Sequence, residues 1–111
     1  MIVEYTRYKV SQDRQTAFRQ AYQDAQQYLH NSPHCVGYEL SHCTEDPERY
    51  VLRIEWVSVE EHLQGFRRDP SFKSFFSLVQ PFISNIEEMQ HYELTEIAGD
   101  GGAVGKRKAS M

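Results

Sequence analysis

Hydrophobic and polar residues alternate along three stretches of the chain with the two-residue period of a β-strand. The clearest pattern covers residues 50–57, where the even-numbered residues form the apolar side and end at Trp56. Residues 2–10 and 35–44 alternate in a similar way, and MQHYELTEI over residues 89–97 supplies a fourth stretch. We therefore predict four strands over these ranges.

Two other segments change to spacings of three and four residues, which are typical of an amphipathic helix. The first follows Ser11, which we expect to cap it, and ends before Pro33. The second starts at Ser58, in a capping box with Glu61, and restarts at Asp69-Pro70. A helix interrupted in this way is expected to lie across the sheet.

The order of these elements is β-α-β-β-α-β, the split βαβ arrangement of a ferredoxin-like α+β fold with a four-stranded antiparallel sheet. The second helical segment holds five of the six phenylalanines, between Phe66 and Phe82, and is expected to roof any pocket. Residues 1–97 are predicted to form this single domain. The glycine-rich residues 98–111 are predicted to be a disordered tail, because they offer little to bury.

The sheet face away from the helices is predicted to mix apolar and charged side chains. They are Val3, Tyr5, Arg7, Val51, Arg53, Glu55 and Val57. Monomers seldom leave so large a mixed face in water. We therefore expect a homodimer in which two sheets face each other across a two-fold axis, as in a dimeric α/β barrel.

Composition and charge narrow the range of partners. The 111 residues carry a net charge of −4, and the basic cluster Lys106-Arg107-Lys108 lies outside the predicted fold, so no nucleic-acid surface is expected. No apolar run approaches the roughly 20 residues of a membrane span. The charged start MIVEYTRYKV does not fit a signal peptide. With two cysteines, a reducing cytoplasm is the expected location.

Two pairs, His34-Cys35 and His42-Cys43, contain the side chains that zinc prefers. Eight strand residues at about 3.3 Å each separate the pairs by about 26 Å, and adjacent strand residues point to opposite faces. This argues against a shared zinc site and against a disulfide between Cys35 and Cys43. No glycine loop precedes a helix to hold a nucleotide, so we predict no metal and no cofactor.

The run Tyr50-x-Leu52-x-Ile54-x-Trp56-x-Ser58-x-Glu60, followed by Asp69-Pro70-Ser71-Phe72 and a phenylalanine-rich helix, resembles the antibiotic biosynthesis monooxygenase (ABM) family of dimeric α/β barrels. The order of elements over residues 1–97 is similar to that family as well. The resemblance implies a cleft between sheet and helices in each protomer. In some members this cleft oxygenates aromatic polyketides of the anthrone type, with molecular oxygen and neither metal nor flavin. Other members degrade haem, handle quinols or have no established chemistry.

The resemblance also allows a comparison with the haem-degrading branch of the family. The haem-degrading members use an asparagine in the first strand, a tryptophan in the second helical region and a histidine soon after it. Thr6, Gly65 and Phe75 or Phe76 stand at these points here, so haem degradation is not expected.

Two residues are candidates for acid–base catalysis in the cleft. His62 lies on the apolar stripe of the second helical segment, where it is either a packed, hydrogen-bonded side chain or a base with a suitable ordinary pKa of about 6.5. Glu4 lies on the helix-facing side of the first strand, where a carboxylate needs a partner or a cavity. Paired with an arginine or tyrosine it would be structural; facing the cleft it would be an acid or base with a raised pKa.

Five further residues are candidates for substrate contact: Tyr8, Thr6, Trp56, Phe66 and Phe76. Trp56 is either a core anchor or a flat wall for a planar ring. Many ABM members carry histidines where this chain has Phe66 and Ser71, so these polar groups are missing from the predicted cleft.

We therefore predict an oxidoreductase, a cofactor-independent monooxygenase acting on a small planar aromatic or quinol-like substrate. The alternative is a non-catalytic ligand-binding or accessory homodimer with the same fold. A continuous cavity that reaches Trp56 and contains a polar group favours the enzyme. A roof sealed by side chains favours the accessory protein.

Overall fold

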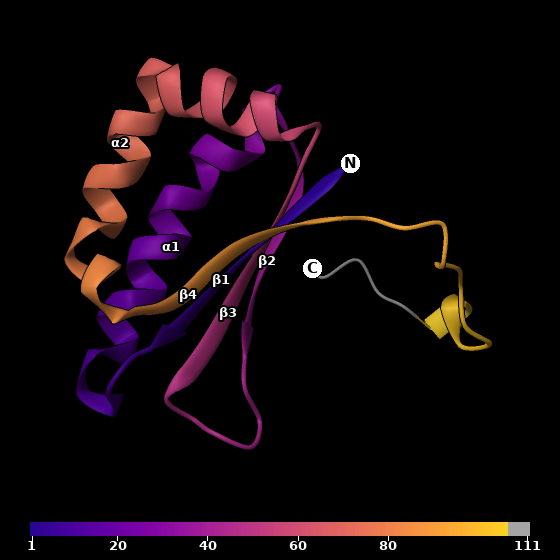
Figure 1. Cartoon of the computed structure of the whole chain (residues 1–111). Coiled ribbons are helices and arrows are strands. Elements are labelled where there is room, and N and C mark those ends of the chain that lie inside the picture. The colour runs from indigo at the N-terminus through magenta and orange to yellow at the C-terminus, as the bar shows by residue number, and fades with distance from the viewer. Residues whose placement is uncertain (107–111) are drawn as a thin grey trace.

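The computed structural model describes residues 1–106 and has the predicted ferredoxin-like α+β fold. The strands are β1 (Ile2–Lys9), β2 (Cys35–His42), β3 (Arg49–Trp56) and β4 (Ile86–Glu93), and the helices are α1 (Gln15–His30) and α2 (Pro70–Val79). All neighbouring strands are antiparallel, in the order β2-β3-β1-β4. Both helices cover the same face of the sheet (Figure 1). Within the described residues, no helix is both long and apolar enough to cross a membrane.

The central position of β1 decides which residues meet beneath the helices. Glu4 on this strand lies opposite Ile54 on β3 and opposite His91 on β4. Directly opposite residues of an antiparallel pair share a face of the sheet. The fold therefore brings Glu4 and His91 side by side on the helix-covered face.

Two of the three predicted caps are observed. The Asp69 side chain accepts a hydrogen bond from the Ser71 amide at 2.9 Å, with Pro70 in the first turn of α2, and Ser58 Oγ accepts one from the Glu61 amide at 3.0 Å. The prediction for Ser11 is wrong. Its hydroxyl donates to Asp13 instead, at 2.6 Å, and a short 3₁₀ turn precedes α1.

The fourth strand begins earlier than predicted, at Ile86 instead of Met89, and ends at Glu93. The reason lies in Pro81, which has no amide hydrogen to continue an α-helix. Helix α2 therefore ends at Val79 and continues as the 3₁₀ segment Gln80–Asn85. Ile86 is therefore the first residue of β4, although its spacing of four residues from Phe82 suggested that it belonged to the helix.

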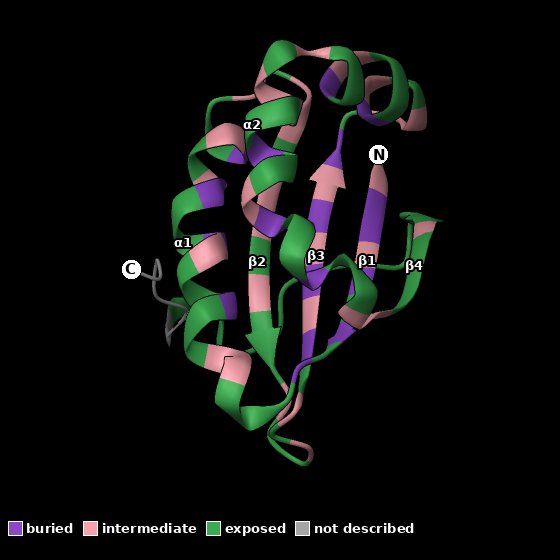
Figure 2. Cartoon of the chain, turned by 90° about the vertical axis from the view of Figure 1, so that its left-hand side faces the viewer, coloured by how far each residue is buried: buried purple, intermediate pink, exposed green. Residues whose placement is uncertain are grey.

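The hydrophobic core lies between the sheet and the helices, where the buried stripes of α1, α2 and β3 face one another (Figure 2). Its largest fully buried side chains include Trp56, Tyr8, Phe18 and Phe66. Cys35 and Cys43 are both free thiols, as predicted.

The opposite face of the sheet carries the predicted mixture, with Val3 opposite Glu55 and Tyr5 opposite Arg53. Ion pairs cross this face. Arg7 Nε lies 3.0 Å from Glu88 Oε1. Arg53 Nη1 lies 3.3 Å from Glu39 Oε1, and its Nη2 lies 3.5 Å from Glu55 Oε1. The face is therefore more ionic than the alternation of residues alone suggested.

The segment after β4 runs away from the helices (Figure 1). Residues 98–105 are all exposed, and Val104–Lys106 forms a short 3₁₀ turn. Arg107 to Met111, the rest of the predicted tail, lie outside the described residues.

We propose that residues 98–111 contribute little to the stability of the domain. Deleting residues 99–111 should shift the melting temperature by less than about 2 °C, since a loss of 1 kcal/mol would shift a domain of this size by about 4–8 °C. Differential scanning calorimetry of the two chains at equal concentration would measure the shift. A fall of several degrees would show that the segment packs against the domain.

Candidate functional site

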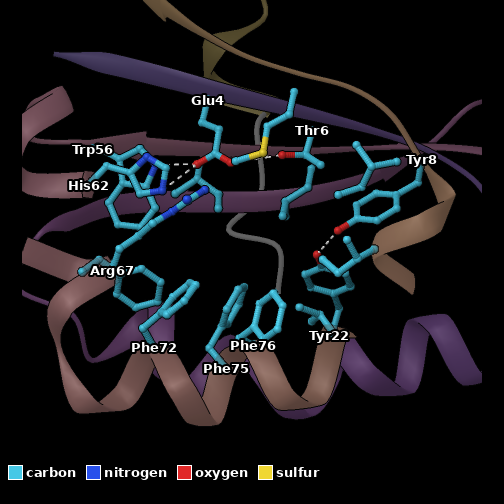
Figure 3. Close-up of a pocket in the computed structure, with 17 residues that line it drawn as sticks. Glu4, Thr6, Tyr8, Tyr22, Trp56, His62, Arg67, Phe72, Phe75 and Phe76 are labelled. Atoms are coloured by element: carbon cyan, nitrogen blue, oxygen red, sulfur yellow. Dashed lines mark hydrogen bonds and ion pairs between the residues drawn. The ribbon is translucent and has the colours of Figure 1, made fainter. Parts of the chain in front are cut away.

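A cavity of ≈ 140 Å³ lies between the helix-facing side of the sheet and the broken second helical region. All seven predicted site residues line it: Glu4, Thr6, Tyr8, Trp56, His62, Phe66 and Phe76. Figure 3 shows Glu4 and Thr6 on the strand side of the cavity, with Phe72, Phe75 and Phe76 on the helix side. The roof is not sealed, and the cavity reaches Trp56. The chemical roles of these residues remain predictions.

Glu4 is 3% exposed and is surrounded by hydrogen-bond donors. Trp56 Nε1 donates to Oε1 at 2.9 Å, and Thr6 Oγ1 donates to Oε2 at 3.1 Å. His62 Nε2 lies 3.5 Å from Oε1. Neither an arginine nor a tyrosine, the partners considered for a structural role, is among the hydrogen-bond or ion-pair partners of Glu4 within the described chain. Glu4 is thus both partnered and at the cavity wall, so the two alternatives for this residue are not exclusive.

His62 stacks on Trp56, with ring centroids 4.4 Å apart and planes 8° from parallel. Its Nδ1 lies 2.7 Å from Nε2 of His91. Because the Glu4 carboxylate faces Nε2 of His62, we assign the proton to this nitrogen. His62 Nδ1 then accepts a hydrogen bond from His91. Both nitrogens of His62 are therefore engaged by protein groups.

Burial lowers the pKa of His62 to about 3, and the positive charge of Arg67 and the neighbouring His91 act in the same direction. The Glu4 carboxylate, 3.5 Å away, opposes this shift. The imidazole is consequently neutral at pH 7 and is a weak proton acceptor.

A π-helical turn, Glu61–Gly65, presents His62 to the sheet. His34 contacts this turn through its side chain, with Nδ1 2.5 Å from Glu61 Oε1. A Cβ atom on residue 65 would lie 2.6 Å from the His34 ring, so glycine is needed for this close approach. His34, first considered as a zinc ligand, instead supports the turn that carries His62.

The other end of the cavity is formed by Tyr8 and Tyr22, whose hydroxyl groups are hydrogen-bonded to each other. Burial raises the pKa of Tyr8 to about 12 and also raises the pKa of Tyr22. Both phenols are therefore protonated near neutral pH. They act as neutral hydrogen-bonding groups opposite the Trp56 end (Figure 3).

Sequence reasoning missed three polar residues of the site, Tyr22, Arg67 and His91. In a regular α-helix a residue five positions after His62 points about 140° away from it, so the helical period does not place Arg67 on the same face as His62. The π-helical turn changes this spacing, because it brings residues i and i+5 together. Arg67 lines the cavity, and its Cζ lies 5.9 Å from the Phe72 ring centroid.

His91 was the harder residue to find, because its place depends on the register between β1 and β4. The predicted strand over residues 89–97 included it, but nothing in the sequence set it opposite Glu4. The alternation signal could have found it only together with a correct strand start at Ile86.

Glu4, His62 and His91 place donor atoms within 4.8 Å of one another, the one such group found among the described residues. Imidazole and carboxylate ligands suit zinc, iron, copper or nickel. In this structure the three groups face one another in hydrogen-bonding contacts, and the positive charge of Arg67 acts on the same histidine. That charge opposes a cation here, and we assign no metal to the group.

A second, larger groove of ≈ 440 Å³ lies between α1 and the strands β2 and β3. None of the seven predicted site residues lines it. We therefore place the candidate site in the cavity around Glu4.

Comparison with known proteins agrees with this fold. The family model described as "Antibiotic biosynthesis monooxygenase" matches residues 1–78. The chain belongs to this family. The match includes Glu4, His62 and Arg67, whereas His91 lies beyond it.

Individual relatives of this ABM protein are distant. The uncharacterized protein YczJ of Bacillus subtilis is 23% identical over 93 residues, covering 84% of this chain and 98% of YczJ. The crystal structure of a candidate ABM protein from Bordetella bronchiseptica has a TM-score of 0.70 and 25% identity, covering 85% of this chain and 96% of that one. A similar protein from Deinococcus radiodurans has a TM-score of 0.71 at 15% identity, covering 92% and 100%, and this likeness concerns the fold alone.

The protonation state of His62 can be tested directly. We expect His62 in the folded ABM protein to stay neutral down to about pH 4, one unit above its lowered pKa of about 3, with its proton on Nε2. Long-range ¹H–¹⁵N NMR spectra would show which nitrogen is protonated, and His62→Gln would assign the signals.

The unfolded protein in urea is the reference, where histidine titrates near its ordinary pKa of about 6.5. Because the unfolded chain binds this proton first, folding stability should fall as the pH is lowered from about 6.5 towards 3. Titration of folded His62 near pH 6.5 would contradict the assignment.

Proposed function

We propose that this ABM protein is a cofactor-independent monooxygenase acting on a small planar aromatic or quinol-like substrate. The observation that carries the proposal is a buried carboxylate, Glu4, at the wall of an open aromatic cavity that reaches Trp56. Membership of the ABM family and its monooxygenase-named structural relatives support the reaction type. The unsealed roof argues against an accessory protein whose cleft is filled by side chains.

The volume of the cavity favours a single-ring substrate. An engineered protein cavity of about 150 Å³ is known to hold benzene. At ≈ 140 Å³, the cavity of the ABM protein matches one ring better than the three fused rings of an anthrone. Phenols and hydroquinones are therefore the preferred class.

We assign the role of proton acceptor to Glu4, with His62 as the residue that positions it. Two observations favour this division of roles. Both ring nitrogens of His62 already contact protein groups, His91 and Glu4, and burial lowers the pKa of the imidazole. On Glu4, Oε2 accepts only from Thr6 within the described chain. This oxygen can take a substrate proton without displacing Trp56 or His62.

The proposed chemistry consumes one O₂ per substrate. Glu4 removes the phenolic proton, and the ring carbon of the resulting anion forms a bond to O₂, which is reduced to a hydroperoxide. The proton on Glu4 completes this hydroperoxide. Loss of the ring C–H proton then breaks the O–O bond, so that the carbon becomes a carbonyl and one water leaves. A phenol plus O₂ thus gives a quinone plus water.

The remaining residues hold the substrate and exclude water. The rings of Trp56, Phe66 and Phe76 form apolar walls, and the Tyr8–Tyr22 pair offers hydroxyl groups at the far end. Restricting the orientation of the ring and removing water both favour the reaction of a carbanion-like intermediate.

Glu4→Gln tests the catalytic proposal. Glutamine keeps the size of the side chain and a carbonyl oxygen for Trp56, but it cannot take a proton. Oxygen uptake with a panel of phenols and hydroquinones should fall by about 10²-fold or more, the usual worth of a positioned base. Glu60→Gln, which alters an exposed carboxylate near the same helical turn, should leave uptake unchanged.

Each assay should be repeated after treatment with a chelator, because Glu4, His62 and His91 are potential metal ligands. Activity that disappears with chelation would refute the cofactor-independent reaction. Absence of oxygen uptake by the wild-type protein across the whole panel would favour the accessory homodimer.

We also propose that the protein is a homodimer joined through the ionic sheet face. The supporting observations are the half-buried Tyr5 and Val51 on this face, the exposed Val57 beside them, and Arg53 at its centre. In one protomer Arg53 is held between Glu39 and Glu55. A facing copy would cover these groups from water.

Light scattering at micromolar concentration should give about 26 kDa, twice the 13.0 kDa of one chain. Arg53→Glu should lower this mass, because it would place a third carboxylate beside Glu39 and Glu55. Lys73→Glu, on the exposed side of α2, serves as the control. A monomeric wild-type protein would overturn the proposed assembly.

A further inference from the structure

We propose that Arg67 makes this cavity selective for an aromatic acid, a single-ring ligand whose anionic group binds at the cavity mouth. The proposal rests on the proposed function for the location of the site and names the class of molecule that the site prefers. Its test is a binding measurement, which does not require turnover.

Arg67 stands at the rim of the cavity. It lines the cavity while remaining exposed, in the 3₁₀ turn Phe66–Arg68 directly before α2. Its guanidinium lies 5.9 Å from the ring centroid of Phe72, another lining residue. Figure 3 places Arg67 at the same end of the cavity as Trp56 and His62.

The guanidinium of Arg67 has donors to spare. Among residues 1–106 its side chain makes no hydrogen bond and no ion pair, whereas Arg7, Arg14, Arg49 and Arg53 each bind a side-chain oxygen. An arginine fork binds a carboxylate through two parallel hydrogen bonds, which adds orientation as well as affinity.

The two formal charges in the cavity wall are matched differently. Glu4 is buried and accepts hydrogen bonds from Trp56 and Thr6, with the neutral His62 beside it, so its charge is held by uncharged protein groups. Arg67 has no hydrogen-bond or ion-pair partner among residues 1–106, and it lines the cavity while remaining exposed. The uncompensated charge at the mouth is therefore positive, and it attracts an anion.

These positions fix the orientation of the ligand. The acid group lies beside Arg67, and the ring lies against Phe72, Phe75 and Phe76. A hydroxybenzoate has this arrangement of groups.

The experiment compares para-hydroxybenzoate with para-hydroxybenzamide, which share the ring and the hydroxyl group but differ in charge. The chain has a single tryptophan, Trp56, in the cavity wall, so its fluorescence reports binding to this site. The acid should bind at least about tenfold more tightly than the amide, as expected for a charge-assisted pair. The preference should weaken as salt is added.

Arg67→Met should remove this preference while leaving the affinity for the amide nearly unchanged. Arg67→Lys should keep part of it, because lysine retains the charge but not the fork. Arg68→Met is the matched control, since Arg68 lies in the same turn, is exposed and does not line the cavity. Circular dichroism would confirm that the three variants remain folded.

Three results would overturn the proposal: equal affinity of the wild-type protein for acid and amide, no binding of the acid at millimolar concentration, or equal losses in Arg67→Met and Arg68→Met. The outcome is separable from the proposed oxygenase activity. Selective binding without oxygen uptake would support the role of Arg67 and refute the reaction. Oxygen uptake with neutral hydroquinone but no preference for acids would support the reaction and refute the role of Arg67.

Discussion

The burial of the Glu4 carboxylate is the constraint around which this site is built. An unpaired charge beneath two helices would cost several kcal/mol, so the fold must supply donors to it. They come from three elements: Thr6 on β1, Trp56 at the end of β3, and His62 from the π-helical turn. The entry into the second helical region is therefore tied to the sheet by polar contacts as well as by packing.

The same constraint separates the polar and apolar walls of the cavity. Glu4 and its donors occupy the strand side, and phenylalanines from α2 occupy the helix side (Figure 3). In a site with little water, fixed charges act more strongly than they do in solution. A hydrogen-bonded carboxylate in the cavity wall and an unpaired guanidinium at its rim are therefore the two charges that a ligand in this small aromatic cavity meets.

The parts predicted correctly from sequence are those set by local chemistry. Strand alternation through Trp56 and the caps at Ser58 and Asp69 depend on neighbouring residues, and they place Glu4 and His62 on the right elements. The errors arise where distant contacts or an unusual turn decide. Arg67 reaches the cavity through a π-helical turn that the helical period hides, and His91 reaches Glu4 through a strand register that no local pattern specifies.

Phe66 and Ser71, the two positions where the family resemblance led us to look for histidines, show how the chemistry of this chain is distributed. Phe66 is buried against Trp56, with ring centroids 5.2 Å apart, and serves as a wall. The Ser71 hydroxyl donates to Asp69 at 2.8 Å, so it supports the cap of α2 and does not line the cavity. The helix break thus supplies a packed phenylalanine, a helix cap and the adjacent Arg67. The titratable groups Glu4 and His62 lie instead on β1 and on the turn before the break. A site with the same outline can therefore hold different chemistry, because the fold fixes where the cavity lies but not which element carries its polar groups.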